Sequence, residues 1–364
     1  MRSTRSSIFL IVAVLISIGI VMIYSASSIC AYSSMGDSLY FLKRHIIYLT
    51  IGLVMMFAAM TIDINRLKAL SKPIILAAVF LLLFVLVPHI GREIGGAKRW
   101  FKAGPINFQP SEFAKIAVII YMAEFTSRKG PLMKSFLHGF LPAVMVLGVI
   151  VGLILLEPDL GTAITISAIA IIMMFTANAR IYHIAAAILA SLPVLYLALF
   201  RVPYRRKRML TFLNPWADKQ GAGFQIIQSF VALGSGGPFG VGLGQSRQKL
   251  FYLPASHTDF IFSIIGEELG FIGSASIVIL FTAFVWQGMK VAFRALGVFE
   301  RQMALGIVSL IGLEAIINIG VTAGALPTKG LPLPFISYGG SGLIFHLAAV
   351  GLLLNITRSC ETCR

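Results

Sequence analysis

The chain has 364 residues, of which 58% are hydrophobic and only 12% charged, with a mean hydropathy of +0.90. So few charged side chains cannot cover the surface of a soluble protein of this length, so a soluble globular protein is excluded. Lys and Arg number 30 against 14 Asp and Glu, a formal net charge of +16, which favours an anionic lipid surface or an anionic substrate.

Apolar segments of helical length follow one another along the whole chain. At ~20 residues for each spanning helix, the hydrophobic content allows roughly ten spans. None alternates with the period of a barrel strand, so the sequence predicts an all-α integral membrane protein, organised as one polytopic domain over residues 1–364. The first segment is longer than the core of a cleavable signal, so we expect it to be retained. The predicted spans lie near 8–29, 46–62, 74–88, 111–125, 138–156, 160–177, 181–200, 259–287, 303–324 and 334–356.

An even number of spans places both termini on one side of the membrane. The loops 89–110, 157–159 and 201–258 then lie on the opposite side, and the last is a long, Gly- and Pro-rich segment of the kind that builds a site. Lys and Arg outside the spans are shared almost equally between the two sides, so the positive-inside rule does not orient the chain. The positive charge opposite the termini therefore needs another explanation.

The loop before the fourth span and the start of that span carry the first candidate residues. Lys98 and Arg99 form a basic cluster beside Trp100, an aromatic residue suited to the membrane interface. Glu112 and Lys115 follow at i and i+3, on one helical face about one turn into the membrane. Ionisable groups at that depth should face the bundle interior, either as a self-neutralising pair or as the wall of a cavity that substrate reaches.

The long loop opens with a run of cations directly after the seventh span. Arg205, Arg206 and Arg208 offer bidentate donors of the kind that bind a phosphate or diphosphate group. The simpler interpretation is a stop-transfer flank that contacts anionic lipid headgroups. Two basic clusters on one side favour an anionic, lipid-like ligand.

A glycine-rich stretch and the mouth of the eighth span come next. The glycines of 234–244 lack the ending of a nucleotide-binding loop, so a tight turn on the membrane surface is the simpler interpretation and no nucleotide is implied. Asp259 stands beside His257 at the start of the span, where capping of the first helical turn alone would explain a carboxylate. Glu267, on the same helical face, and Glu268, on the opposite face, add carboxylates two turns deeper and favour a functional role as well.

The segment 327–341 before the last span is rich in Pro and Gly and carries Lys329 and Ser337. Irregular backbone at membrane depth has to line a cavity rather than face lipid. The three cysteines are too few and too scattered for disulfides or a zinc site, and we interpret them as incidental.

Five motifs in order along the chain resemble the SEDS family of shape, elongation, division and sporulation proteins, and the basic run and the Lys329 motif are more similar to its FtsW/SpoVE branch. Ala255, where the family often has Glu, and Gly342, where Ser is usual, depart from the pattern. The matching motifs are Gly95–Trp100 with Gln109–Glu112, Glu157–Thr162, Arg205–Trp216, His257–Phe262 and Lys329–Ser341.

The resemblance implies a peptidoglycan glycosyltransferase that polymerises lipid II on the outer face of the cytoplasmic (inner) membrane, with both termini cytoplasmic. It implies a catalytic Asp259 and a polar cavity lined at Glu112 and Lys115. The implied partners are an undecaprenyl-diphosphate-linked glycan, a class B penicillin-binding protein and other division proteins. A divalent cation, Mg or Mn, is also implied. No nucleotide, organic cofactor or nucleic acid is expected. We expect substrate contacts at Glu112, Lys115, Lys98, Arg99, Trp100, Asp159, Arg205, Arg206, Arg208, His257, Lys329 and Ser337.

The expected chemistry suits this inventory. A diphosphate leaves as an anion, so transfer from such a donor needs no protonated carboxylic acid, unlike glycoside hydrolysis. We expect Asp259 to take the proton from the 4-hydroxyl of the acceptor's N-acetylglucosamine, while cations stabilise the diphosphate. A lipid II flippase and a non-catalytic division scaffold are the alternatives. We find no pseudo-symmetric pair of broken spans for the first, and buried ionisable groups are unneeded for the second.

Overall fold

The computed structural model describes residues 2–88, 91–94, 97–103, 106–221 and 223–362. The long helices are α1 (Arg2–Met35), α2 (Tyr40–Ala59), α4 (Ser71–Leu86), α5 (Pro110–Lys129), α6 (Leu141–Leu156), α7 (Leu160–Thr176), α8 (Ile181–Phe200), α11 (Ile261–Arg294), α12 (Val298–Thr322) and α13 (Ser341–Thr362). The shorter elements are α3 (Ile64–Ala69), α9 (Pro203–Leu213), α10 (Phe224–Ser235), the helical turns η1 (Gly130–Lys134), η2 (Phe136–Phe140) and η3 (Pro215–Asp218), and the strands β1 (Arg92–Ile94), β2 (Ala97–Ala103) and β3 (Ile106–Phe108).

Each predicted span overlaps one of the ten long helices, so the prediction of an all-α membrane protein is confirmed, although the last span, predicted from 334, becomes helical only at Ser341. Within the described residues, seven helical segments are long and apolar enough to cross a membrane: α1, α2, η2 with α6, α8, α11, α12 and α13. The helices α4 and α7 are slightly shorter, with 16 and 17 residues, and α5 carries charged residues inside the bundle. The antiparallel sheet β1-β2-β3 inside the 89–110 loop was not predicted.

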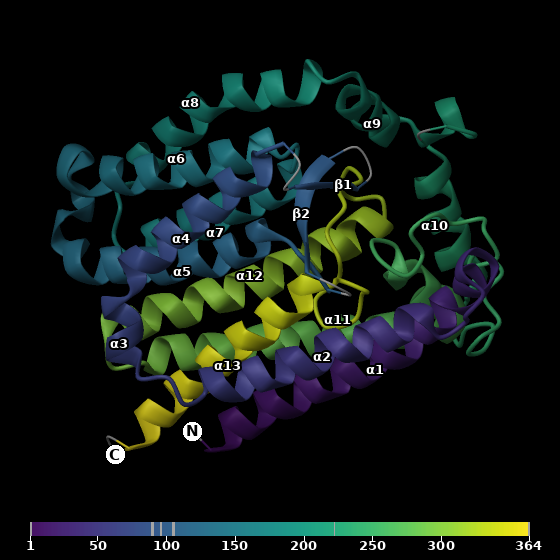
Figure 1. Cartoon of the computed structure of the whole chain (residues 1–364), viewed down its shortest axis with the longest axis horizontal. Coiled ribbons are helices and arrows are strands. Elements are labelled where there is room, and N and C mark those ends of the chain that lie inside the picture. The colour runs from purple at the N-terminus through teal and green to yellow at the C-terminus, as the bar shows by residue number, and fades with distance from the viewer. Residues whose placement is uncertain (1, 89–90, 95–96, 104–105, 222, 363–364) are drawn as a thin grey trace.

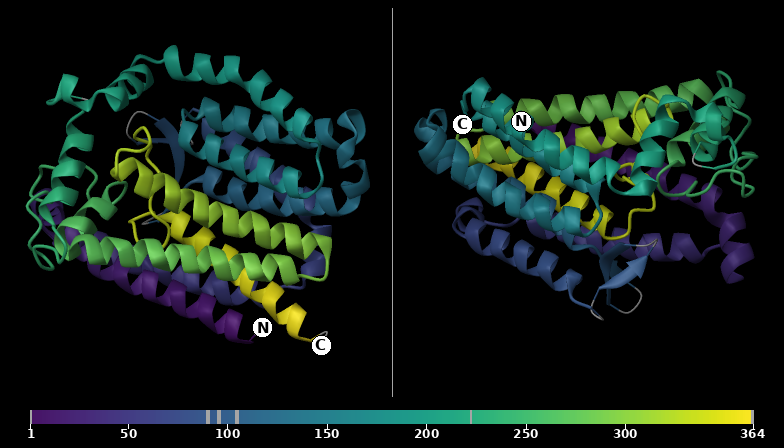
Figure 2. Two further views of the ribbon diagram at one scale, coloured as in Figure 1. Left: turned by 180° about the vertical axis from the view of Figure 1, so that it is seen from behind. Right: turned by 90° about the horizontal axis from the view of Figure 1, so that it is seen from above.

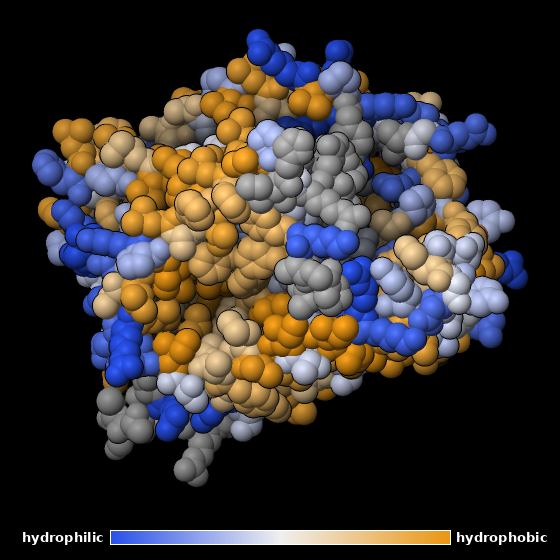
Figure 3. Space-filling model, viewed as in Figure 1, coloured by the Kyte–Doolittle hydropathy of each residue, from blue (hydrophilic) through white to orange (hydrophobic). Residues whose placement is uncertain are grey.

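The bundle is built around α5 and α12, which are buried on most of their surfaces. The helix α12 packs against α5, α7 and α11, and α13 packs against α2. In contrast, the buried residues of α8 are only His183 and Ile184, near its start, and Figures 1 and 2 show this helix arching over the bundle toward α9. Figure 3 shows a broad hydrophobic area over α2 and α4 with hydrophilic residues toward both ends, as expected for a membrane-facing surface.

The two termini lie close together at one end of the bundle, and the small sheet, α9 and α10 lie toward the other (Figure 1). The loops predicted to share a side meet at that second end. The guanidinium of Arg99 on β2 donates from Nε to the carbonyl of Glu157 at 2.8 Å and also to the carbonyl of Pro158. The predicted common side of the loops 89–110 and 157–159 is therefore confirmed.

The glycine-rich stretch packs against a break in α11 instead of forming a simple surface turn. Gly270 interrupts that helix with a φ of 67°, and a Cβ atom there would come within 2.3 Å of the backbone nitrogen of Gly240. The amides of Val241 and Gly242 donate to the carbonyls of Glu267 and Glu268, at 2.9 and 3.1 Å. Only glycine permits backbones to approach this closely, so these residues serve packing rather than phosphate binding.

Candidate active site

Two cavities open at the end of the bundle opposite the termini, and they share Arg99, Asp159, Asp259 and Gly330. The cationic cavity, about 300 Å³, is lined by Arg99, Pro158, Asp159, Leu160, Gly161, Leu199, Arg205, Arg208, Met209, Asp259, Pro327, Thr328, Lys329 and Gly330. The polar cavity, about 420 Å³, is lined by Tyr48, Arg99, Trp100, Asn107, Gln109, Glu112, Asp159, Thr162, Thr258, Asp259, Gly330, Leu331, Pro332, Tyr338, Gly339 and Gly340. Asp259 therefore borders both.

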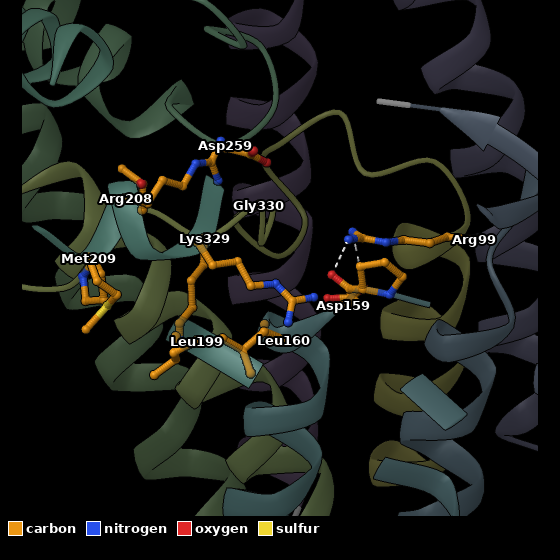
Figure 4. A pocket seen from close by; sticks show the side chains of 14 residues that line it. Arg99, Asp159, Leu160, Leu199, Arg208, Met209, Asp259, Lys329 and Gly330 are labelled. Carbon is orange, nitrogen blue, oxygen red and sulfur yellow. Dashed lines mark hydrogen bonds and ion pairs between the residues drawn. The ribbon is translucent and has the colours of Figure 1, made fainter. Parts of the chain in front are cut away.

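The cationic cavity gathers four cations from three separate parts of the chain: β2, α9 and the loop before α13. Arg99, Arg205, Arg208 and Lys329 line it against two carboxylates. Arg99 lies 3.7 Å from Asp159, an ion pair that Figure 4 marks with a dashed line, while Lys329 makes no ion pair with any residue that the structure describes. Burial lowers the pKa of the Lys329 ammonium, the direction expected for a cation that lacks an anionic neighbour. A diphosphate would supply that neighbour.

Asp259 lies just before α11, half-buried between the two cavities. The capping residue of α11 is Phe260, with no side-chain cap, so Asp259 is not in the first helical turn and capping does not explain it. Burial raises the pKa of its carboxyl to about 6, against the opposing effect of Arg208, and the nearby Asp159 raises it further. Figure 4 shows Arg208 extending toward Asp259 from α9. Such a carboxylate is mostly ionised at neutral pH and is suited to accept a proton.

Two residues expected at the substrate, His257 and Ser337, lie behind Asp259 and outside the residues that line either cavity. The ring of His257 contacts Phe41, with centroids 4.4 Å apart, and burial lowers its pKa to about 4, so it is neutral. The hydroxyl of Ser337 donates to the carbonyl of Thr258 at 2.7 Å. Both residues therefore support the loop that carries Asp259.

Glu112 lines the polar cavity as expected, whereas Lys115 lies behind it. The ammonium of Lys115 is 2.8 Å from Glu112 Oε2 and also contacts Glu314 of α12. The other oxygen of Glu314 is 2.6 Å from Nε2 of His346 on α13. The predicted pair is thus part of a buried four-residue network. Its other members, Glu314 and His346, were missed because polar residues scattered through an apolar span show no local pattern.

Asp159 and Glu157, two residues apart, have different environments. Asp159 caps α7, with Oδ1 accepting from the amide of Thr162 at 3.1 Å and Oδ2 from the side chain of Gln109 at 3.2 Å. Glu157 is fully buried, and neither carboxylate oxygen has a hydrogen-bond partner among the described residues. Burial raises the pKa of Glu157 to about 8, so it is mostly protonated at neutral pH.

The remaining predicted residues divide between the site and the surface. Trp100 lines the polar cavity. Arg206 is exposed and lines neither cavity, although Arg205 and Arg208 beside it do, because adjacent residues of α9 point in different directions. The side chain of Lys98 lies outside what the structure describes.

The two glutamates of α11 do not join Asp259. Glu267 accepts from the amide of Arg247 at 2.9 Å, and Glu268 pairs with Lys249 at 2.8 Å and with Ser25 of α1. They anchor the long loop to the bundle. The expectation that they add carboxylates to the site is therefore wrong, because the loop folds back over them.

The family resemblance implies a divalent cation, but the described residues supply no complete set of protein ligands for one. In the part of the chain that the structure describes, no group of three His, Cys, Asp or Glu side chains could hold a metal ion. Two carboxylates, Asp159 and Asp259, reach the cationic cavity, and Asp159 already accepts two hydrogen bonds. We therefore assign no reaction step to a metal.

The fold and the two cavities define a polytopic helical membrane protein with a cation-rich polar site at the end opposite its termini. The chain belongs to the family of cell cycle proteins that includes FtsW, RodA and SpoVE, because the sequence model of that family matches residues 5–362.

Its relatives match over nearly their whole length. A "Probable peptidoglycan glycosyltransferase FtsW" of Geobacter metallireducens is 47% identical over 96% of this chain and 93% of its own. Stage V sporulation protein E of Bacillus subtilis is 44% identical over 96% and 95%. A chain from the solved structure of a peptidoglycan synthase complex that coordinates polymerization and crosslinking has a TM-score of 0.79, 31% identity and 97% coverage of both chains. The rod shape determining protein RodA of Thermus thermophilus has a TM-score of 0.71 and 27% identity, covering 97% of this chain and 96% of its own.

Proposed function

We propose that this protein is a peptidoglycan glycosyltransferase that polymerises lipid II into glycan strands at the outer face of the cytoplasmic membrane during cell division, with both termini in the cytoplasm. The observation that carries the proposal is the position of Asp259, between a cavity lined by four cations and a second cavity lined by aromatic, amide and carboxylate side chains. The names of the FtsW relatives support the reaction class.

The two cavities suit the two parts of the reaction. The donor's diphosphate binds among Arg99, Arg205, Arg208 and Lys329, which stabilise the negative charge of the departing group. The acceptor's sugar binds in the polar cavity, where Trp100 and Tyr338 supply aromatic surface and Gln109 and Asn107 supply amide groups.

In the proposed step, the 4-hydroxyl oxygen of the acceptor's N-acetylglucosamine forms a bond to C1 of the donor's N-acetylmuramic acid. The bond from C1 to the diphosphate oxygen breaks, and the electron pair leaves with the undecaprenyl diphosphate. Asp259 accepts the hydroxyl proton and later releases it to water. A positioned base contributes ~10²- to 10⁴-fold to a rate of this kind.

A transpeptidase of the class B penicillin-binding protein type is the proposed partner. The supporting observation is the similarity, at a TM-score of 0.79, to a chain of a peptidoglycan synthase complex that coordinates polymerization with crosslinking. Other division proteins and, through the substrate's diphosphate, Mg²⁺ or Mn²⁺ belong to the same proposal.

The test is a polymerisation assay with the purified full-length protein in detergent and fluorescent lipid II, read out as glycan strands on a gel. Polymer formed without a membrane excludes transport alone as the explanation. Asp259→Asn should lower the rate ~10²- to 10⁴-fold while the protein still folds and binds lipid II. A wild-type rate in that variant would show that Asp259 is not the base, and product that forms only after the partner is added would leave part of the scaffold alternative standing.

A further inference from the structure

The three consecutive carbonyl groups at the mouth of α11 are each held by a hydrogen bond from the C-terminal third of the chain. The amide of Tyr338 donates to the carbonyl of His257 at 3.0 Å, and the hydroxyl of Ser337 donates to that of Thr258 at 2.7 Å. The side-chain amide of Asn318 donates to that of Asp259 at 2.9 Å. The amides of Thr258 and Phe260 already donate to the carbonyl of Ala255 within the loop, and the three donors tie the backbone around Asp259 to the rest of the bundle.

Asn318 differs from the other two donors because its single nitrogen bridges two segments. Its Nδ2 donates to the carbonyl of Asp259 and also, at 2.7 Å, to the carbonyl of Leu331. It lies on α12 with 2% of its surface exposed, in the centre of the bundle. An amide NH₂ has two hydrogens, and both are used here to join the base to the 329–331 segment.

The joined segment forms the wall against which the Asp259 carboxylate packs. A Cβ atom on Gly330 would lie 3.2 Å from Oδ2 of Asp259, so the carboxylate is close to the bare backbone of that residue. Lys329, a cation that lines the cationic cavity, is the preceding residue. One buried amide thus sets the spacing between the base and a cation of the diphosphate site.

We infer that Asn318 is a positioning residue for glycosyl transfer. By bridging the carbonyls of Asp259 and Leu331, it holds Asp259 at a constant position relative to Lys329 and Gly330. The inference rests on the proposed role of Asp259 as base. Asn318 does not line either cavity, so it acts through the backbone and not through contact with substrate. A misplacement of about 1 Å in a reacting group costs up to ~10²-fold in rate.

The chain contains a matched control for this bridge. Asn355 on α13 has 8% of its surface exposed, and its Nδ2 also donates to two carbonyl groups, those of Ala59 at 3.0 Å and Ile62 at 2.6 Å. It joins the ends of α13 and α2 on the side of the termini, far along the bundle from both cavities. Loss of this bridge removes the same kind of contact without disturbing the base.

The experiment compares Asn318→Leu with Asn355→Leu in the purified full-length protein, measuring kcat and KM for lipid II polymerisation and the melting temperature. Both variants should lower the melting temperature. Only Asn318→Leu should lower kcat, by ~10- to 100-fold, with KM changed less than about 3-fold. Ser337→Ala, which removes the donor to Thr258, should lower kcat in the same direction and serves if Asn318→Leu does not fold.

The pH dependence supplies a readout that loss of stability alone would not move. If the loop that carries Asp259 shifts, the Asp259 carboxylate moves away from Gly330, Asp159 and Arg208. The acidic limb of the kcat/KM profile then moves to a different pH. The limb should stay in place in Asn355→Leu. Wild-type kcat in Asn318→Leu, or equal losses of kcat in Asn318→Leu and Asn355→Leu, would overturn the inference. If Asn318→Leu does not fold, wild-type kcat in Ser337→Ala would overturn it.

Asp259→Asn, measured in parallel, separates this inference from the proposed function. If Asp259→Asn is inactive while Asn318→Leu is fully active, only the positioning role fails. If Asp259→Asn retains the wild-type rate, the base assignment fails, and the positioning role fails with it.

Discussion

The ammonium of Lys115 lies 2.8 Å from the carboxylate of Glu112 inside the bundle, and only 2% of the Lys115 side chain is exposed. The same ammonium contacts Glu314, so one cation serves two buried carboxylates, and His346 contacts the second of them. Removal of one member of such a network leaves uncompensated charge among buried side chains. The network therefore sets both the stability of the bundle and the charge at the floor of the polar cavity.

The first prediction concerns the stability of this network. Lys115→Met should destabilise the protein by ~3–5 kcal/mol, because Glu112 and Glu314 lose their shared cation. Thermal unfolding in detergent, followed by tryptophan fluorescence, measures the effect. Lys43→Met is the control, because Lys43 pairs with Asp37 at 2.7 Å on the surface, with side chains 63% and 40% exposed, and its loss should cost ~0–1 kcal/mol. Equal melting temperatures in the two variants would contradict this account.

The second prediction concerns the pH dependence of activity. The pKa of Asp259 is raised to about 6, and a base must be ionised to accept a proton, so kcat/KM should fall as the pH drops below about 6. Arg208 opposes this rise, so Arg208→Leu should move the acidic limb to higher pH. The measurement is kcat/KM for lipid II between pH 4.5 and 8 in both proteins. An acidic limb near pH 4 in the wild type would be incompatible with the buried position of the base.

The third prediction concerns Glu157 and stability. Its pKa in the folded protein is about 8, above the ordinary value of 4.5, so the folded state holds a proton that the unfolded state releases. Stability should therefore fall as the pH rises from about 4.5 to 8. Glu157→Gln keeps the neutral shape and should remove this dependence, so its melting temperature should increasingly exceed that of the wild type across this window. A difference that stays constant with pH would show that Glu157 is ionised when folded.

The fourth prediction separates neighbouring arginines. Arg205 lines the cationic cavity and Arg206 is exposed outside it. Arg205→Met should weaken inhibition by undecaprenyl diphosphate ~10- to 100-fold, since a hydrogen bond to a charged group is worth ~1.5–3 kcal/mol. Arg206→Met should change it less than about 2-fold. Similar losses in both variants would indicate that the run attracts anionic lipid in general and binds no particular phosphate.

The sequence by itself determined the membrane fold, because apolar runs of spanning length leave the backbone no alternative to helices in lipid. It also determined that Asp259, Arg99 and Lys329 stand in loops at one end of the bundle, since the alternation of spans places those loops together. The motifs could be recognised in the sequence because polar residues cluster in these loops, between long apolar segments.

Only the tertiary structure decided which of these residues face a cavity. Arg205 and Arg206 are neighbours in sequence, and their separation depends on how α9 lies over the bundle. Asn318, Glu314 and His346 are polar residues scattered through apolar spans, and their roles come from partners that are distant in sequence, such as Asp259 for Asn318 and Lys115 for Glu314. Glu267 and Glu268 face the folded-back loop instead of Asp259 for the same reason. A buried polar group takes its function from the partner that satisfies it, and packing, not local sequence, selects that partner.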